Sequence, residues 1–400
     1  MTIGQLAGGK RIGSDEAASM RSFCDSGGDR SLCSDQAKNN AAKEFLAMNF
    51  LKHVFTFACV VALSIACLGR AGATDAEVIG AGASFPAPAI EAWARQFSRE
   101  SGVKLVYRSV GSGEGILRVT ARSVDFAMTD VPLTQAELLQ DDLMQFPVIV
   151  GAIVPVVNIP GIGDGELKLT GILLADIFLG KITSWDAPAI KMLNPQLSLP
   201  NLPIRVVHRS DGSGTSFVFT YYLSAVSSDW QGRLGIGSRL NWPTGSGARG
   251  NEGVSQAVHE VAGGIGYVEY TYSLEHKLCM VQLQNKNAKF VRASDSGVRA
   301  TLASAHWSRP TYYEVLVNRD GDESWPIVGV SFALLHKSQE DPATAIATLN
   351  FMQWIYAHGA DLARRLHYVP LIDSSLIGRI ESSWDDIHDD KGTSLWKNRK

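Results

Sequence analysis

The strongest constraint on the fold is a recurring order of elements: a short apolar strand, a Gly-rich turn that contains Ser or Thr, and the start of a helix. The pattern occurs at residues 80–88 (GAGASFPAP), 110–117 (VGSGEGIL) and 208–217 (HRSDGSGTSF). Strands that alternate with helices are typical of a mostly parallel sheet. The sequence therefore predicts an α/β fold.

Two long apolar runs divide the chain into units. Residues 147–157 are suited to a buried strand, and the Asn-Ile-Pro-Gly stretch at 158–161 then breaks the pattern and predicts a crossover into a second unit. The run that begins at Trp325 (WPIVGVSFALLHK) predicts another buried strand. We expect the chain to return there to the first unit.

The segment 48–73 has the plan of a secretory signal peptide. It has a basic residue at Lys52, a 15-residue apolar run from Val54 to Leu68, and small residues up to Ala73. Because a membrane-spanning helix needs about 20 residues, an uncleaved anchor is the weaker alternative. We expect translation to start at Met48, cleavage to follow Ala73, and residues 1–47 to be a non-native or disordered extension.

Cysteine and charge exclude some functions. Of the five cysteines only Cys279 follows residue 73, so no internal disulfide is expected in the exported chain. The formal net charge of the whole chain is −3 at pH 7, and the segment after residue 73 is more negative still. This balance argues against a nucleic-acid partner. Any anion must be bound by a local arrangement of donor groups and not by the overall charge.

The three Gly-rich turns are suited to an anion, because a helix start presents free backbone N–H groups and the positive end of the helix dipole. The donors predicted for such an anion are the hydroxyl and N–H groups of Ser84, Phe85 (through its N–H), Ser112, Ser213, Gly214 and Thr215. A capped helix after a glycine turn is also ordinary structure, so each turn alone remains ambiguous.

Arg209 and Asp211 strengthen the third turn. Two residues apart on an extended chain, their side chains share a face, so Asp211 can hold the guanidinium of Arg209 toward an anion. The alternative is a surface ion pair, which would contribute little.

Asp130 follows the predicted strand 124–128 and raises a question of specificity. An ionised carboxylate repels an anion, but phosphate keeps at least one proton near neutral pH, and the carboxylate can accept that P–O–H hydrogen bond. Sulfate has no such proton, so a site with Asp130 would reject it. The alternative is that Asp130 caps the following turn.

Motifs of catalysis and metal binding are missing from the sequence. Gly180-Lys181 lacks the spacing of a Walker A loop, Ser213 lacks the flanking glycines of a nucleophile elbow, and no H-E-x-x-H occurs. We therefore expect no cofactor, no metal and no enzymatic activity.

Together the motifs resemble one family. GAGASFPAP, the Gly111-Ser112 loop, VDFAMTDVPL, LLADIFLGKITSW, RSDGSGTSFVFTYYL and GIGYVEY, in this order, resemble the PstS family of phosphate-binding proteins that serve Pst-type ABC importers. The resemblance covers residues 77–390. It implies the type II periplasmic-binding fold, with two α/β lobes, a hinge and a ligand cleft between them. Lobe I is expected at 74–158 plus 326–400, and lobe II at 159–325.

The resemblance also implies a function. It predicts high-affinity binding of inorganic phosphate in the periplasm by a monomer that delivers it to inner-membrane permease subunits with their ATPase. The phosphate ligands are expected to be Ser84, Phe85, Ser112, Asp130, Arg209, Ser213, Gly214 and Thr215, with Asp211 holding Arg209. Glu114 departs from some relatives, and its charge would weaken anion binding if it faced the cleft.

Two rival functions can be weighed from the sequence, whereas a third, surface adhesion or phosphate sensing on the same scaffold, leaves no trace that separates it from transport. One is binding of another tetrahedral oxyanion, such as sulfate or molybdate, and Asp130 argues against it. The other is a secreted phosphatase that uses Ser213 or Ser84 as nucleophile, but no base or metal set is in place to activate either serine.

Overall fold

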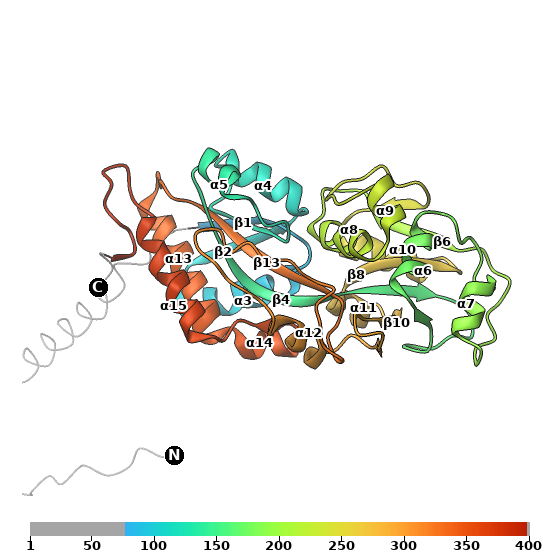
Figure 1. Cartoon of the computed structure of the whole chain (residues 1–400). Coiled ribbons are helices and arrows are strands. Elements are labelled where there is room, and N and C mark those ends of the chain that lie inside the picture. Colours follow the sequence, from blue (N-terminus) through green and yellow to red (C-terminus); the bar gives the residue numbers. More distant parts are fainter. Residues whose placement is uncertain (1–76, 398–400) are drawn as a thin grey trace, which may run out of the picture. The chain divides into compact units, whose positions relative to one another are not determined.

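The computed structural model describes residues 77–397, which belong to the compact unit Thr74–Lys400. The expectations for residues 1–47 and for a signal peptide at 48–73 lie outside the described residues. Figure 1 shows that the described chain forms two lobes and that strand β4 (Leu143–Asn158) runs from one into the other.

The first lobe, lobe I, is built on a mixed sheet. β1 (Glu77–Gly82) pairs in parallel with β2 (Lys104–Ser109) and with β3 (Phe126–Thr129), and β13 (Ile327–His336) pairs antiparallel with β3 and β4. β13, which starts at Ile327, lies between β3 and β4 in this sheet.

The second lobe, lobe II, contains the strands that pair with the last residues of β4. Residues 143–152 of β4 pair with β13, whereas residues 153–158 pair antiparallel with β8 (Gly264–Glu269). Beyond β8 the sheet continues in parallel through β6 (Arg205–Arg209) and β7 (Ser246–Ala248). The strand expected at 147–157 is therefore confirmed and longer than expected. The lobe boundaries at 158 and 326 stay predictions.

Small strands complete the two sheets. β12 (Leu316–Val317) pairs with β13, β14 (Val369–Pro370) and β9 (Cys279–Met280) pair with β4, and a separate three-stranded sheet contains β5 (Lys168–Leu169), β10 (Gln282–Gln284) and β11 (Phe290–Val291).

Helices follow several of the strands, as the sequence predicts. They are α3 (Ala87–Ser101), α4 (Ser112–Thr120), α5 (Gln135–Gln140), α6 (Gly171–Phe178), α7 (Pro188–Leu193), α8 (Gly214–Val226), α9 (Ser228–Arg233), α10 (Gly250–Glu260), α11 (Tyr270–Glu275), α12 (Asp295–Leu302), α13 (Pro342–His358), α14 (Ala360–Arg365), α15 (Ser374–Ser383) and the 3-10 turn Trp384–Asp386.

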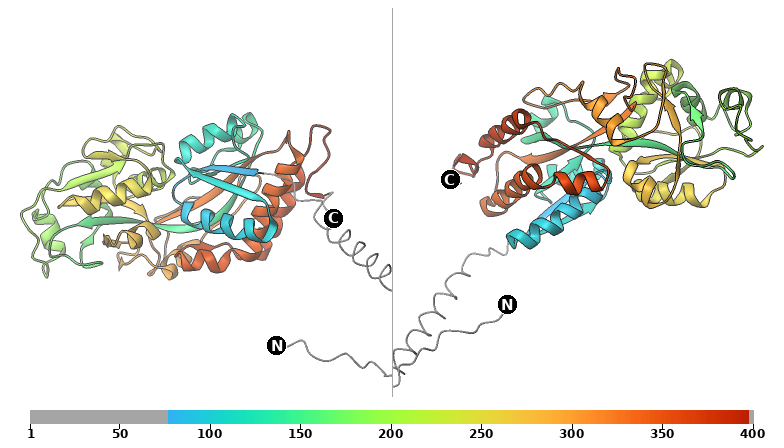
Figure 2. Two further views of the ribbon diagram at one scale, coloured as in Figure 1. Left: turned by 180° about the vertical axis from the view of Figure 1, so that it is seen from behind. Right: turned by 90° about the horizontal axis from the view of Figure 1, so that it is seen from below.

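The helix ends have local causes. α3 starts directly after Pro86 and ends at Gly102, whose positive φ of 77° is accessible to glycine at little cost. α13 starts at Pro342, and the Asp341 side chain accepts hydrogen bonds from two N–H groups of its first turn. Both views in Figure 2 show the C-terminal helices beside α3, so the end of the chain packs on lobe I.

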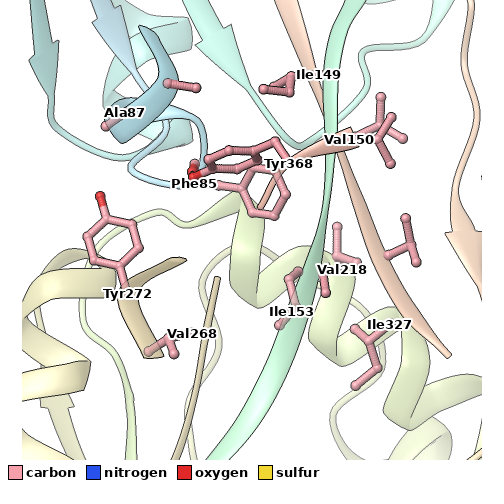
Figure 3. Packing of buried hydrophobic residues seen from close by; sticks show 14 of the residues in the cluster. Phe85, Ala87, Ile149, Val150, Ile153, Val218, Val268, Tyr272, Ile327 and Tyr368 are labelled. Atoms are coloured by element: carbon pink, nitrogen blue, oxygen red, sulfur yellow. The ribbon is translucent and has the colours of Figure 1, made fainter. Parts of the chain in front are cut away.

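Buried aromatic side chains fill both lobes. In lobe II the rings of Phe219 and Tyr267 stack with centroids 4.1 Å apart. Near the junction of the lobes, Phe85 packs edge-on against Tyr368, with ring centroids 6.0 Å apart, and Figure 3 shows these rings beside β4. The core therefore extends to the place where the first Gly-rich turn meets the second lobe.

Candidate functional site

The three Gly-rich turns meet between the lobes. The turn before α3 and the turn before α4 follow the carboxyl ends of the neighbouring parallel strands β1 and β2, so they share one edge of the lobe I sheet. The turn before α8 belongs to lobe II. It touches lobe I where the Gly113 N–H donates to the Gly212 carbonyl at 2.9 Å and the Gly214 N–H donates to Ser112 Oγ at 3.1 Å.

Gly214 is required by this close approach. A Cβ at this position would lie 2.5 Å from both Asp130 Oδ2 and Ser112 Oγ. Real Cβ atoms do not come so near, so any larger residue would require Asp130 and Ser112 to shift or the turns to separate. Gly214, which the sequence predicts as an N–H donor to an anion, also allows the turns to come into contact.

Asp130 follows β3 and is buried, with 2% of its surface exposed. Its Oδ1 accepts a hydrogen bond from Ser331 Oγ at 2.8 Å. Its Oδ2 has no hydrogen-bond partner among residues 77–397. Burial raises the pKa of Asp130 to about 7, against the lowering effects of the Ser331 hydrogen bond and the Arg209 charge. One buried carboxyl oxygen is thus left to interact with a ligand.

Arg209, at the end of β6, is held by Asp211 in a bidentate ion pair. Nε lies 2.7 Å from Oδ1 and Nη2 lies 2.5 Å from Oδ2, and the guanidinium side chain is only 1% exposed. The N–H of Gly250 also donates to Asp211 Oδ1 at 3.1 Å. Burial alone would raise the pKa of Asp211, but the hydrogen bonds and charge of Arg209 outweigh it and hold that pKa below its ordinary value. The surface ion pair considered as an alternative is therefore wrong for Arg209.

Three buried hydroxyl groups share one hydrogen-bonding pattern, since each accepts two N–H bonds. Ser84 Oγ accepts from Asn251 N at 3.2 Å and Nδ2 at 3.0 Å. Ser112 Oγ accepts from the N–H groups of Asp130 at 3.3 Å and Gly214 at 3.1 Å.

Thr215 completes this set of hydroxyls. Its Oγ1 accepts from Arg209 Nη1 and from Asn251 Nδ2, each at 3.4 Å. A hydroxyl has two lone pairs and one hydrogen, so two accepted bonds leave the hydrogen to donate. Within the described part of the chain none of the three hydroxyls donates to a protein acceptor. The hydrogen of each of the three hydroxyls is therefore available for donation to a further acceptor.

For the other expected ligands, Ser213, Gly214 and Phe85, the structure shows only contacts within the protein. Ser213 Oγ caps α8 by accepting from the Ser216 N–H at 3.1 Å, which uses one of its lone pairs. The Phe85 side chain is fully buried, and its carbonyl accepts from the Tyr368 hydroxyl at 2.6 Å. Contacts of Ser213, Gly214 and the Phe85 N–H with an anion stay predictions.

Glu114 is paired outside the buried polar cluster, which consists of Ser84, Ser112, Asp130, Arg209 and Thr215. Its carboxylate binds Arg118 Nε one helical turn later, at 2.8 Å, and 44% of its side chain is exposed. It lines a surface pocket of about 540 Å³ together with Arg239 and Arg249. Its charge is therefore partly balanced at the outer side of the turns.

Two surface pockets flank the contact between the turns. The first, of about 560 Å³, includes Ser84 and Gly250, and the second is the one that contains Glu114. Both share Asp211 and Arg249 in their walls, but neither is lined by Asp130, Arg209 or Thr215. The buried polar cluster thus lies behind turns that are in contact.

Sequence reasoning missed Asn251 and Ser331. Asn251 lies in the first turn of α10 in lobe II but binds Ser84, 167 residues earlier in lobe I. Ser331 lies in β13 and binds Asp130, 201 residues earlier. Neither carries a local signal, since one follows a glycine at an ordinary helix start and the other interrupts an apolar strand.

The described residues lack features of a metal site and of a membrane span. Within 77–397 no group of three or more His, Cys, Asp or Glu side chains is arranged to hold a metal ion. None of the helices in this range combines the length and apolar character needed to cross a bilayer.

Residues 69–358 match the family model of the PBP superfamily domain. The chain is 45% identical over 327 residues to the phosphate-binding protein PstS of Pasteurella multocida, covering 81% of this chain and 95% of that protein. It is 46% identical over 309 residues to the protein of the same name from Haemophilus influenzae, covering 77% and 92%.

Solved structures share the fold at low identity. A high affinity periplasmic phosphate-binding protein (PfluDING) bound with phosphate is 19% identical, with a TM-score of 0.61 over 77% of this chain and 94% of that chain. A phosphate binding protein from Stenotrophomonas maltophilia is 20% identical, with a TM-score of 0.57 over 76% and 92%. These likenesses bear on the two-lobed fold alone.

Proposed function

Because the chain belongs to the PstS family of phosphate-binding proteins, we propose that it binds inorganic phosphate between its lobes in the periplasm and delivers it to an ABC-type permease. The observation that carries this proposal is the composition of the buried cluster. It contains three hydroxyls with a hydrogen available for donation, the Arg209 guanidinium, and one buried carboxyl group whose second oxygen has no partner among residues 77–397.

The cluster matches a tetrahedral oxyanion that still carries a proton. Hydroxyl, guanidinium and backbone N–H donors bind the charged oxygens, and Asp130 Oδ2 accepts the remaining P–O–H hydrogen. Sulfate would place an oxygen without hydrogen against this carboxylate, so the contact would be repulsive. The same observation therefore favours phosphate over the sulfate or molybdate alternative.

Calorimetry of the wild-type protein with phosphate, sulfate and molybdate tests this function. We expect phosphate to bind with a Kd at least about 100-fold below that of sulfate near pH 8, a difference of about 2.8 kcal/mol. Binding of sulfate as tight as that of phosphate would contradict the proposal.

The turns that touch across the cleft have to separate for phosphate to enter. We infer an open form in which the Gly113–Gly212 and Ser112–Gly214 contacts are broken, with phosphate favouring the closed form through contacts made to both lobes. Small-angle scattering with and without phosphate should show compaction on binding.

The proposal includes capture without catalysis, by a monomer that needs no cofactor. His208, the histidine nearest in sequence to Arg209, stacks on Trp242 with ring centroids 4.9 Å apart, and burial lowers its pKa. It therefore acts as a packing residue in lobe II. Hydrolysis of p-nitrophenyl phosphate that disappears in Ser213→Ala would favour the phosphatase alternative instead.

Location and partners follow from the family as proposals. We infer export to the periplasm with cleavage after Ala73, and delivery to inner-membrane permease subunits coupled to an ATPase. N-terminal sequencing of the exported protein is expected to start at Thr74. A start before Met48 would contradict the proposed signal peptide.

A further inference from the structure

Asn251 is a buried, uncharged side chain at the centre of the polar cluster. It is fully buried, and its Oδ1 accepts the Glu269 N–H at 3.1 Å, which fixes the orientation of the amide. The Nδ2 group then points to two hydroxyls, Ser84 Oγ at 3.0 Å and Thr215 Oγ1 at 3.4 Å. One of these hydroxyls belongs to each lobe.

The effect on the two hydroxyls follows from the direction of the bonds. An amide NH₂ group only donates, so Ser84 and Thr215 must accept from Asn251 and cannot donate to it. The backbone N–H of Asn251 donates to Ser84 Oγ as well, at 3.2 Å. Both hydrogen bonds that Ser84 Oγ accepts come from Asn251 in lobe II, so they form only when the lobes are in contact.

We propose that Asn251 is a positioning residue that turns the hydroxyl hydrogens of Ser84 and Thr215 toward the bound anion when the lobes meet. The inference rests on the proposed binding of phosphate by these hydroxyls. Asn251 itself need not touch phosphate. Its action on Ser84 also makes the donor set complete only in the closed form, so that closure and recognition are coupled through one amide.

A purely structural role for Asn251 predicts a different outcome, and the chain offers a matched control. Asn194 is also fully buried, and its amide also makes three hydrogen bonds, to Lys168 N–H, the Lys168 carbonyl and the Ile190 carbonyl. These partners belong to β5 and α7, away from the polar cluster. Asn194→Ala should therefore lower Tm without weakening phosphate binding.

A double-mutant cycle with Ser84 tests the inference. We expect Asn251→Ala and Ser84→Ala each to weaken phosphate binding about tenfold, as the loss of about one hydrogen bond to a charged ligand predicts. If Asn251 acts through Ser84, then adding Ser84→Ala to the Asn251→Ala variant raises the Kd for phosphate less than about threefold. Full additivity of the two losses would overturn the inference.

Asn251→Asp supplies a second test that keeps the side-chain shape. A carboxylate accepts where the amide donates, so the hydroxyls of Ser84 and Thr215 would turn their hydrogens toward it and away from phosphate. We expect a loss of about 100-fold at pH 8, larger than that of Asn251→Ala. A smaller loss than in Asn251→Ala would indicate a shape-filling role and overturn the inference.

The measurements also separate this inference from the proposed function. Titration calorimetry with phosphate gives each Kd, and thermal unfolding shows whether each variant is folded. If Asn251→Ala does not fold, the same cycle is run in the Asn251→Asp background, with the same criterion of additivity. Tight wild-type binding with additive losses overturns the role of Asn251 alone, whereas absence of phosphate binding by the wild type overturns both.

Discussion

Asp130 in lobe I and Glu269 in lobe II are both buried carboxyl groups, and burial raises the pKa of both, to about 7 and about 8. They differ in their partners. Both oxygens of Glu269 are engaged, by the Thr271 hydroxyl at 3.3 Å, the Thr271 N–H at 3.0 Å and the Tyr368 hydroxyl at 2.9 Å. Asp130 has one oxygen with no partner in the described chain. A raised pKa reports burial, whereas the unpartnered oxygen beside oriented donors indicates a ligand.

The Tyr368 hydroxyl explains how Glu269 is accommodated. It lies within hydrogen-bond distance of both the Phe85 carbonyl, at 2.6 Å, and Glu269 Oε2, but it has only one hydrogen. A protonated Glu269 can donate to the Tyr368 oxygen while Tyr368 donates to Phe85. We therefore infer that Glu269 links the lobes in its neutral form, whereas Asp130 is proposed as a ligand group.

The largest effect is expected from Arg209→Ala, because Arg209 supports Asp130 and the anion together. The variant removes a buried cation and leaves the half-buried Asp211 carboxylate without its cationic partner. We expect phosphate affinity to fall about 1000-fold by calorimetry. Arg319→Ala, which breaks the ion pair with Glu314, is the control and should leave the Kd within about threefold.

The next largest effect on phosphate affinity is expected when a buried carboxyl group is replaced by its amide. Asp130→Asn places an NH₂ donor or a neutral oxygen against the P–O–H group, and we expect about 100-fold weaker phosphate binding. Glu269→Gln keeps a donor toward Tyr368 and should change the Kd less than about threefold. Equal losses in the two variants would mean that burial, and not the free oxygen, decides the role of a carboxyl group.

Ser331→Ala should weaken phosphate binding less than Asp130→Asn does, because it changes only the pKa of Asp130. The Ser331 hydrogen bond lowers the pKa of Asp130, so its loss raises this pKa further. Asp130 then remains protonated to higher pH and accepts the P–O–H group less well. We expect about tenfold weaker binding at pH 7 and a pH profile displaced upward. Ser383→Ala, another buried serine, removes a bond to the Ile380 carbonyl and serves as control.

The smallest effect concerns Glu269 and stability. Its pKa in the folded protein is about 8, above the ordinary value of 4.5, so the folded state binds more protons than the unfolded state between these values. Its contribution to stability is therefore complete below about pH 4.5 and is lost as the pH rises toward 8. Glu269→Gln should make Tm less dependent on pH between 5 and 8. An unchanged Tm profile would contradict the neutral link.

The sequence predicted the turns well and the long-range partners poorly. Ser84, Ser112, Arg209 and Thr215 follow strands in a repeated local pattern, and the structure joins them with Asp130 in one network. Periodicity cannot reveal partners that are far apart in the chain. A serine in an apolar strand such as β13 has no local mark that it will bind Asp130.

The fold shows the same limit in β4. Its apolar run predicted a buried strand, and β4 is buried along nearly its whole length. The change of partner between Ala152 and Ile153 depends on β13 and β8, which follow much later in the chain. Hydrophobicity therefore shows that a strand is covered, but not that it joins two lobes.

The most direct test of the account is the ratio of phosphate to sulfate affinity in the wild type and in Asp130→Asn, measured by calorimetry at pH 8. The free oxygen of Asp130 is expected to accept the phosphate proton and repel sulfate. We expect a ratio of at least about 100 in the wild type that falls at least about tenfold in Asp130→Asn, because phosphate binds more weakly and the new amide donates to sulfate. An unchanged ratio would contradict it.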